Sequence, residues 1–254
     1  MNKIKKFRIV KFKSKPLLRA KDISKSFDDR IVLQNLNFSI SPGEIFGLLG
    51  PNGAGKSVTF QILIGITKAD HGEVLVSGSR VNELPIHERT LKYKIGYIPQ
   101  NESVFRGLSA EDNLRSICEI SIKNKEIIEN TVTNLLSDFS LTDVRKVAAK
   151  NLSGGQRKKL VIARALINKP RILIMDEPFS AIDPINIEVI KKIIVNLQNR
   201  GISILVSDHS FQNVISCSDR VAIISDGQII ASGTPKQIIS DEQARKVYFG
   251  ESFY

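Results

Sequence analysis

A glycine-rich loop after a short apolar run constrains the fold of this chain more than any other feature. The run, Glu44–Leu49, is typical of a buried strand, and helix-compatible sequence extends from Lys56 to about Gly65. Between them a glycine and four further residues precede Gly-Lys-Ser, which is the spacing of a phosphate-binding loop. A strand, a tight loop and a helix are therefore predicted in succession. The loop consists of Gly50, Pro51, Asn52, Gly53, Ala54, Gly55, Lys56 and Ser57.

This loop has the residue types that a triphosphate and its Mg²⁺ require. Glycines allow the backbone to curl so that several N–H groups point at one phosphate cluster, and the following helix presents its positive dipole end. Lys56 adds a full positive charge for the β- and γ-phosphates. The Ser57 hydroxyl is a hard oxygen ligand suited to Mg²⁺. The segment therefore predicts a phosphate-binding site with a bound divalent cation.

A second strand-like run, Arg171–Met175, ends in two adjacent acids, Asp176 and Glu177. Carboxylates at the carboxyl end of a buried strand lie where α/β folds bind ligands. Acids at strand ends are also common in turns, so the pair alone leaves both interpretations open. Together with the phosphate loop, it predicts that Asp176 holds Mg²⁺, directly or through water. It also predicts that Glu177 orients and deprotonates the attacking water.

A third segment, Asn151–Arg157, predicts the start of a helix that runs to about Ile167. A serine is a suitable N-cap here, and the two glycines after it permit close approach of another backbone. Such a helix start is a second anion site in the same chain. Because one nucleotide does not need two such sites, we expect a second copy of the chain to complete each site. The residues concerned are Ser153, Gly154, Gly155 and Gln156.

The remaining pattern predicts an α/β core with a largely parallel sheet and a mostly helical lobe inserted into it. Helical periodicity continues from about Ser109 to Lys150 without a convincing strand. Strands are predicted at Leu17–Phe27, Ile31–Ile40, Glu44–Leu49, Ile95–Ile98, Arg171–Met175, Ile202–Val206 and Arg220–Ile224. Apolar helix faces in the lobe are predicted to hold Ile117, Ile120, Ile127, Ile128, Val132, Leu135 and Leu136.

Charge is distributed unevenly along the chain. The net charge is +11, and the first sixteen positions hold seven basic residues and no acid. The remaining body is only mildly basic, which argues against a broad nucleic-acid surface, so no nucleic-acid partner is expected. The basic start either contacts anionic lipid headgroups or is a solvated terminus without function, and the sequence leaves both open.

Composition is that of an ordinary globular protein, with 42% hydrophobic and 25% charged residues. No apolar run approaches the roughly 18 to 20 residues that a membrane-spanning helix needs. No apolar segment of a secretory signal follows the basic start. Cys118 and Cys217 lie far apart and lack metal-ligand spacing, which favours a reducing cytoplasm. A protein that serves a membrane from outside the bilayer is therefore expected.

Residues 152–156 read LSGGQ, the signature of ABC (ATP-binding cassette) ATPases, with the phosphate loop before it and the Asp-Glu strand after it. The chain therefore resembles the ATP-binding subunit of an ABC transporter. The resemblance implies an α/β fold of the P-loop NTPase class, built as an ABC-type nucleotide-binding domain. Its parts are a RecA-like core, an antiparallel β subdomain and an inserted helical subdomain. The resemblance also implies ATP and Mg²⁺ as ligands and ATP hydrolysis as the reaction.

Further positions match family motifs residue by residue. Gln100 matches the Q-loop glutamine, which contacts Mg²⁺ and senses the transmembrane partner. His209 matches the switch histidine that contacts the γ-phosphate, so it joins Glu177 as a catalytic residue. Asp183 ends a segment similar to the D-loop, although its third position is more often leucine than isoleucine. The other histidines, His71 and His87, match no motif and are expected on the surface.

Two positions of the nucleotide site depart from the family pattern. Phe27 stands where relatives stack an aromatic ring, usually tyrosine, on adenine. Phenylalanine keeps the stacking face and loses the hydroxyl, and an ordinary core aromatic is the alternative. Val58 replaces the common threonine after Ser57, which alters a phosphate contact and leaves the Mg²⁺ ligand in place.

The resemblance implies a head-to-tail homodimer in which each ATP lies between Gly50–Ser57 of one copy and Ser153–Gln156 of the other. It also implies transmembrane ABC subunits as partners, while the ATPase does not contact the cargo directly. The implied layout is a basic tail at residues 1–16 and an ABC ATPase domain at residues 17–254. The helical subdomain spans about residues 101–168, and a C-terminal extension spans about residues 234–254.

Within the family, the chain is most similar to the ATPases of lipopolysaccharide exporters. Phe105 and Arg106 occupy the place of a Phe-Arg pair in the groove for coupling helices, although an exposed pair could also be a loop anchor. The ending, Asp241–Phe253, resembles the terminal helix and tail of those subunits. This implies LptF- and LptG-like membrane subunits with an LptC-like component, at the cytoplasmic face of a Gram-negative inner membrane. The alternative is the ATPase of a branched-chain amino-acid importer.

Overall fold

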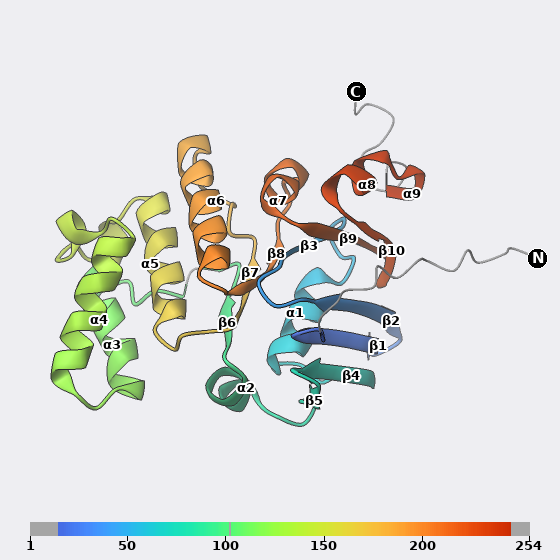
Figure 1. Cartoon of the computed structure of the whole chain (residues 1–254), viewed down its shortest axis with the longest axis horizontal. Coiled ribbons are helices and arrows are strands. Elements are labelled where there is room, and N and C mark those ends of the chain that lie inside the picture. The colour runs from blue at the N-terminus through green and yellow to red at the C-terminus, as the bar shows by residue number, and fades with distance from the viewer. Residues whose placement is uncertain (1–14, 102, 245–254) are drawn as a thin grey trace, which may run out of the picture.

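The computed structural model describes residues 15–101 and 103–244 (Figure 1). Within these ranges the strands form one sheet of four, ordered β2-β1-β4-β5, and one of six, ordered β10-β9-β3-β8-β7-β6. The strands are β1 Leu18–Phe27, β2 Arg30–Ile40, β3 Ile45–Leu49, β4 His71–Val76, β5 Ser79–Arg80, β6 Ile95–Ile98, β7 Ile172–Asp176, β8 Ser203–Ser207, β9 Arg220–Ser225 and β10 Gln228–Gly233. The helices are α1 Lys56–Ile64, α2 Ile86–Tyr93, α3 Ala110–Ser121, α4 Lys125–Asp138, α5 Gly154–Leu166, α6 Pro184–Asn199, α7 Phe211–Cys217, α8 Pro235–Ser240 and α9 Glu242–Ala244, with 3-10 turns η1 Thr142–Val144 and η2 Ala149–Asn151.

Parallel pairing in the larger sheet brings the predicted site together. β3 pairs in parallel with β8 and β9, and β8 pairs in parallel with β7. The phosphate loop follows β3, the acids Asp176 and Glu177 lie at the end of β7, and His209 follows β8. Because parallel strands end at the same edge of a sheet, these three distant segments become neighbours.

The core strands are buried on both faces, which explains their nearly continuous apolar sequences. In β3, Ile45 and Leu49 pack into one hydrophobic cluster, and Phe46 and Leu48 pack into another. The first cluster includes residues of α3 to α8, and the second includes α1 and the antiparallel sheet. In Figure 1, α6 and α7 accordingly lie on one side of the sheet and α1 on the other.

The antiparallel sheet is joined to the parallel sheet by aromatic stacking. The rings of Phe38 in β2 and Phe46 in β3 stack at a centroid distance of 5.4 Å. The guanidinium of Arg220 lies 4.7 Å from the Phe46 ring centroid and donates a hydrogen bond to Glu44 at 2.7 Å. β1 pairs with both β2 and β4 and ends at Phe27, so this sheet carries the Phe27 ring toward the phosphate loop.

The helical lobe contains α3 and α4, which begin at the side-chain caps Ser109 and Asn124. The predicted inward positions Ile128, Val132 and Leu136 are buried. The prediction was wrong for Ile120 and Ile127, which are 81% and 52% exposed. Successive residues of a helix lie about 100° apart, so once Ile128 faces inward its neighbour Ile127 turns toward solvent.

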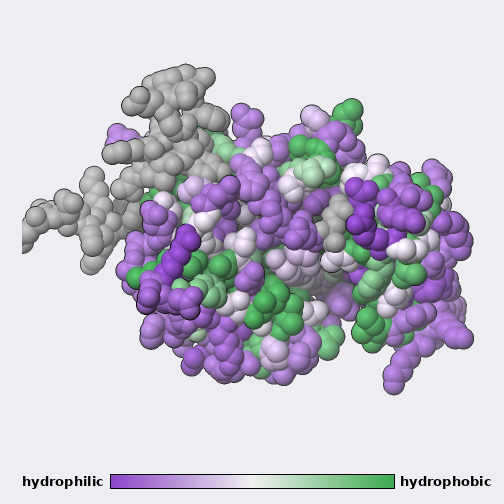
Figure 2. All heavy atoms as spheres, turned by 180° about the vertical axis from the view of Figure 1, so that it is seen from behind, coloured by the Kyte–Doolittle hydropathy of each residue, from purple (hydrophilic) through white to green (hydrophobic). Residues whose placement is uncertain are grey.

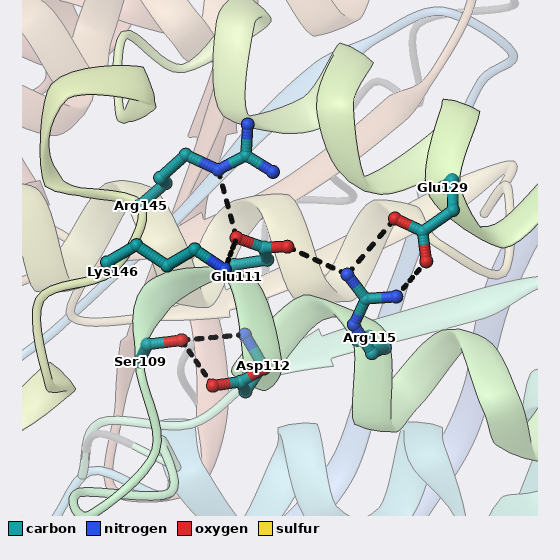
Figure 3. A network of polar contacts seen from close by, with 7 residues as sticks. All are labelled: Ser109, Glu111, Asp112, Arg115, Glu129, Arg145 and Lys146. Atoms are coloured by element: carbon teal, nitrogen blue, oxygen red, sulfur yellow. Dashed lines mark hydrogen bonds and ion pairs between the residues drawn. The ribbon is translucent and has the colours of Figure 1, made fainter.

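A buried carboxylate ties the lobe together (Figure 3). Glu111 of α3 accepts hydrogen bonds from Arg145 at 2.9 Å and from Arg115 at 2.7 Å, and it forms an ion pair with Lys146 at 2.9 Å. Hydrogen bonds from these cations, that of Arg145 first, hold the pKa of Glu111 at about 2. Arg115 also pairs with Glu129 of α4, so the network links α3 to α4 and to the segment after η1.

The fold agrees with the predicted class, and the finer segment boundaries remain predictions. Among the described residues no helix is long and apolar enough to cross a membrane. The basic start up to residue 14, Glu102 of the Q-loop region and the predicted tail after residue 244 lie outside the described residues.

Candidate active site

The phosphate loop needs glycine at two positions because its backbone passes close to both sheets. A Cβ on Gly50 would lie 2.2 Å from the carbonyl oxygen of Ile224 in β9. A Cβ on Gly55 would lie 2.5 Å from Leu33 in β2, and the φ angle of Gly55 is +104°, which favours glycine. The loop is thereby fixed between two sheets, with no room for a side chain at either glycine.

The side chain of Lys56 folds back over this loop. Its buried ammonium donates hydrogen bonds to the carbonyl oxygens of Gly50 at 2.7 Å and Pro51 at 2.9 Å. Burial lowers the pKa of Lys56, and the nearby carboxylates of Glu177 and Asp176 act in the opposite direction. No side-chain hydrogen bond caps the start of α1. This helix start and the ammonium therefore form an electropositive end suited to phosphate.

Asp176 and Glu177 are both buried beside the loop. Burial raises the pKa of Asp176 to about 6, although a hydrogen bond from the Ser57 hydroxyl lowers it. That hydrogen bond places the two predicted Mg²⁺ ligands side by side. Glu177 has a φ of 51°, a left-handed conformation that costs a non-glycine residue of the order of 1–3 kcal/mol. Its N–H donates to Ser207 in β8 at 2.7 Å, which holds this strained peptide in place.

The carboxylate of Glu177 is held by two further predicted site residues. Nε2 of Gln100 donates a hydrogen bond to Oε2 at 2.7 Å, and Nε2 of His209 lies 2.6 Å from Oε1. The histidine side chain is half exposed, whereas Glu177 is only 6% exposed. Three residues that lie far apart in the sequence thus meet at one carboxylate.

These residues border a cleft of about 1020 Å³. Phe27 is 45% exposed at its edge and is therefore not a core aromatic. The ammonium of Lys25 lies 5.1 Å from the Phe27 ring centroid. The cleft is large enough for a nucleotide, and an exposed aromatic ring at its edge is suited to stacking on a base. Its lining consists of Phe27, Asp28, Asp29, Arg30, Val32, Asn52, Gly53, Gly55, Lys56, Ser57, Val58, Gln100, Glu177 and His209.

The LSGGQ segment is placed elsewhere on the chain and does not line this cleft. Ser153 caps α5, accepting from the N–H of Gln156, while the Gln156 side chain accepts from the Ser153 N–H at 2.9 Å. Gly155 is required by packing, because a Cβ there would lie 2.2 Å from Oδ1 of Asn186. Asp183 caps α6 and binds the same Asn186 at 2.6 Å, so the signature segment and the D-loop contact each other within one chain.

Phe105 and Arg106 are exposed beside a groove of about 320 Å³. Arg164 of α5 lines this groove and lies 4.8 Å from the Phe105 ring centroid. The other lining residues come mainly from α2, β6 and the end of α5: Ile86, Thr90, Lys94, Ile95, Gly96, Tyr97, Pro99, Ser103, Ala165, Asn168 and Pro170. From behind, hydrophilic residues cover most of the surface and apolar residues form separate patches (Figure 2).

The family comparison decides the identity of this arrangement. The sequence profile described as ABC transporter matches residues 33–180, which is more than half of the chain. The chain belongs to the ABC transporter ATP-binding family. It is therefore an ATP-hydrolysing enzyme of the P-loop class. A second profile, described as a branched-chain amino acid ATP-binding cassette transporter, matches residues 228–254 of this ABC ATPase.

Relatives with curated names cover nearly the whole ABC ATPase. The lipopolysaccharide export system ATP-binding protein LptB of Haemophilus influenzae is 39% identical over 241 residues, spanning 93% of this chain and 98% of the relative. LptB of Escherichia coli K12 is 39% identical over 237 residues with the same coverage of both chains. An uncharacterised ABC transporter ATP-binding protein of Rhizobium meliloti is 37% identical, over 93% of this chain and 87% of the relative.

Solved structures share the fold. A nucleotide-free ATP-binding cassette is similar with a TM-score of 0.85 and 28% identity, over 93% of this chain and all of the other. An ATP-binding cassette in its ADP conformation gives a TM-score of 0.83 at 28% identity, over 94% of this chain and all of the other. A dimeric cassette bound to ADP and Pi gives 0.76 at 26% identity, covering 86% of this chain and 98% of the other. The predicted ABC fold, with its antiparallel sheet and helical lobe, is confirmed.

The sequence reasoning missed several residues of this ABC ATPase site. Asp28, Asp29, Arg30 and Val32 line the cleft, and their proximity to Phe27 was the available signal. Asp208 was also missed. Its buried carboxylate accepts from the N–H of Phe179 at 2.9 Å, and so connects the end of β8 to the segment after β7. No sequence motif distinguishes that role from an ordinary surface acid.

The oxygen donors at the start of α1 and after β6, together with the one at the end of β7, fit Mg²⁺. A hydroxyl, a carboxylate and an amide from Ser57, Asp176 and Gln100 are hard donors of the kind this ion takes together with phosphate oxygens and water. The described residues contain no cluster of three or more His, Cys, Asp or Glu side chains that could hold a metal alone. A site completed by the phosphates of the nucleotide is consistent with both observations.

Proposed function

We propose that this ABC ATPase powers the extraction and export of lipopolysaccharide from the inner membrane. The observation that carries the proposal is the 39% identity to LptB of Haemophilus influenzae over 98% of that relative. In this function the chain lies at the cytoplasmic face of the inner membrane of a Gram-negative bacterium. Its partners there are LptF- and LptG-like transmembrane subunits with an LptC-like component. The ATPase does not touch the cargo.

In the proposed reaction, the phosphate loop and Lys56 bind the triphosphate, and Phe27 stacks on the adenine. Ser57, Asp176 and Gln100 hold Mg²⁺, which supplies charge stabilisation at the phosphates. Glu177 orients the attacking water and accepts its proton, because it is the buried carboxylate at the phosphate end of the cleft. His209 is suited to the γ-phosphate, since its half-exposed ring lines the same cleft. The other cleft residues Asn52, Gly53, Gly55 and Val58 border the nucleotide.

The proposed working unit is a head-to-tail homodimer. The signature residues Ser153, Gly154, Gly155 and Gln156 lie outside the cleft of their own chain, so a second copy must supply them. The test is the rate of ATP hydrolysis per molecule of purified chain as it is diluted. The rate per molecule is expected to fall once the concentration drops below the range of self-association. A rate that stays flat far below that range would contradict the dimer.

The proposed membrane contact is the groove beside Phe105 and Arg106. Phe105→Ala removes an exposed ring that is 47% accessible while leaving the nucleotide cleft intact. We expect this variant to keep the ATPase activity of the isolated subunit and to lose copurification with the membrane subunits. Ile127→Ala, at an exposed apolar position in the helical lobe, is the matched control. Unchanged copurification of the Phe105 variant would contradict a docking role.

A branched-chain amino-acid importer is the second candidate, favoured by the profile that matches residues 228–254. Depletion of the chain separates the two functions. The lipopolysaccharide proposal predicts that lipopolysaccharide accumulates at the inner membrane while amino-acid uptake continues. Loss of branched-chain amino-acid uptake with normal lipopolysaccharide transport would support the importer. Identifying the membrane proteins that copurify with the chain gives an independent answer.

A further inference from the structure

A buried lysine on the signature helix reaches the backbone of the proposed catalytic acid. Lys158 lies in α5, little more than one turn after the cap Ser153, and it is 3% exposed. Its ammonium lies 3.5 Å from the main-chain carbonyl oxygen of Glu177. Burying an ammonium is costly unless it is hydrogen-bonded or paired. We therefore attribute the burial of this lysine to the contacts of its ammonium rather than to the packing of its methylene chain.

The peptide that carries Glu177 is held on both sides. Its carbonyl oxygen accepts from Oγ of Ser180 at 3.0 Å and from the Ser180 N–H at 3.3 Å, as well as from Lys158. Its N–H donates to Ser207. Because the φ of Glu177 is positive, this peptide needs such contacts to stay in place. The position of the carboxylate over the cleft thus depends in part on α5.

We propose that Lys158 is a positioning residue that makes the orientation of Glu177 depend on the position of the signature helix. The inference rests on the proposed homodimer, in which Ser153–Gln156 binds the nucleotide held by the partner copy. The same helix carries Lys158 to the Glu177 of its own chain. A nucleotide in one site therefore orders the base of the opposite site, and each site becomes competent when the other is filled.

Substitution of Lys158 by methionine tests this inference, since methionine keeps an unbranched apolar stem and removes the ammonium. We expect kcat for ATP hydrolysis to fall by about tenfold or more, because misplacement by about 1 Å can cost up to about 100-fold. The KM for ATP and the melting temperature are expected to stay close to those of the unmodified chain. Lys158→Arg is expected to restore most of the activity.

The matched control is Lys159→Met, at the adjacent and more accessible lysine of the same helix, which is expected to keep normal kcat. Three results would overturn the proposal: an unchanged kcat in the Lys158→Met variant, an equal loss in the Lys159 control, or a fall in melting temperature large enough to account for the lost activity.

Mixed dimers show whether Lys158 acts on its own chain or on the partner's nucleotide. Two differently tagged chains are purified together in ATP without Mg²⁺, and the first turnover is measured after Mg²⁺ is added. When one chain carries both Lys158→Met and Glu177→Gln, the other chain keeps both its Glu177 and its Lys158. We therefore expect the same first-turnover rate as in a mixed dimer whose substituted chain carries Glu177→Gln alone. When the two substitutions are in different chains, the only intact Glu177 of the dimer lies in the chain that has lost Lys158. We expect the first turnover of this dimer to be slower than that of the dimer with both substitutions in one chain.

The reverse order of rates, or equal rates, would overturn the proposal. Failure of the homodimer itself gives a different result. In that case the Glu177→Gln variant would show no ATP-dependent association in size-exclusion chromatography, and no mixed dimer would be recovered with both tags.

Discussion

Nε2 of His209 lies 2.6 Å from Oε1 of Glu177, so a side chain that follows β8 holds the carboxylate that follows β7. Gln100 holds the other carboxylate oxygen from the end of β6. Each carboxylate oxygen is thus already engaged by one side chain of the site and keeps a second lone pair toward the cleft. If Glu177 is the base that we propose, a ligand that attracts the histidine and the glutamine is expected to leave its carboxylate more open to water.

Glu177→Gln is expected to keep ATP binding and lose turnover. The amide retains the shape of the side chain and cannot accept a proton, so kcat should fall by at least about 100-fold. Because the nucleotide is no longer cleaved, the ATP-bound dimer should accumulate. Phosphate release and size-exclusion chromatography in ATP measure the two effects. Glu188→Gln on the exposed face of α6 is the control, and normal hydrolysis by the Glu177 variant would remove this residue from the catalytic role.

Gly155→Ala is expected to impair the signature segment through a steric clash. The new methyl group would lie within 2.2 to 2.8 Å of the Asn186 side chain, which Asp183 holds in place. ATP-dependent dimer formation should weaken, and adding Asn186→Ala should restore part of it because the clashing atoms are removed. Gly107→Ala, where an added methyl would meet no other segment within 4 Å and the φ angle is not positive, is the control. No rescue in the double variant would contradict this steric explanation.

The sequence predicted those parts of the fold whose residues carry a local pattern. β3, the phosphate loop, α1 and the cap of α5 at Ser153 were predicted because strand burial, glycine spacing and capping are local properties. The strands β4, β5 and β10 were not predicted. They are short or only partly buried, so their sequences lack the continuous apolar run of β7.

The site was predictable as a set of residues but not as an arrangement. Motif order indicated Gln100, Glu177 and His209, yet only the parallel pairing of β6, β7 and β8 shows that they meet. No motif marks Lys158, because its proposed role depends on where α5 packs in three dimensions. Contacts between elements distant in the sequence are decided by tertiary packing, which local periodicity does not encode.

Glu111→Gln is expected to destabilise the helical lobe by about 1–3 kcal/mol near neutral pH, since three cations lose a buried carboxylate. These cations hold the pKa of Glu111 at about 2, below its unfolded value of 4.5. Such a carboxylate stabilises the fold fully above pH 4.5, and this stabilisation is lost as the pH falls toward 2. Urea unfolding at neutral pH and at pH 4 measures the difference, with Glu119→Gln as the exposed control on the same helix. Equal stability of the Glu111 variant and the parent at neutral pH would contradict the prediction.

Asp176→Asn is expected to make the ligand-free protein more stable while abolishing ATP hydrolysis. Burial raises the pKa of Asp176 to about 6 from 3.8, so the ionised form is disfavoured in the folded state. An acid with a raised pKa gives its full contribution to stability below its unfolded pKa, and that contribution is lost as the pH rises through about 6. Near pH 8 the charged carboxylate therefore weakens the fold, and the neutral amide removes a cost of about 1–3 kcal/mol.

The gain from Asp176→Asn should accordingly be larger near pH 8 than near pH 5, where the folded carboxyl is already mostly protonated. Urea unfolding at the two pH values without nucleotide measures it, and Asp143→Asn at an exposed position of η1 is the control. A variant that is less stable than the parent at pH 8 would show that the ionised carboxylate stabilises the fold through Ser57 and Lys56. The acid would then be retained for structure as well as for the nucleotide, and burial would not be the dominant influence on its charge.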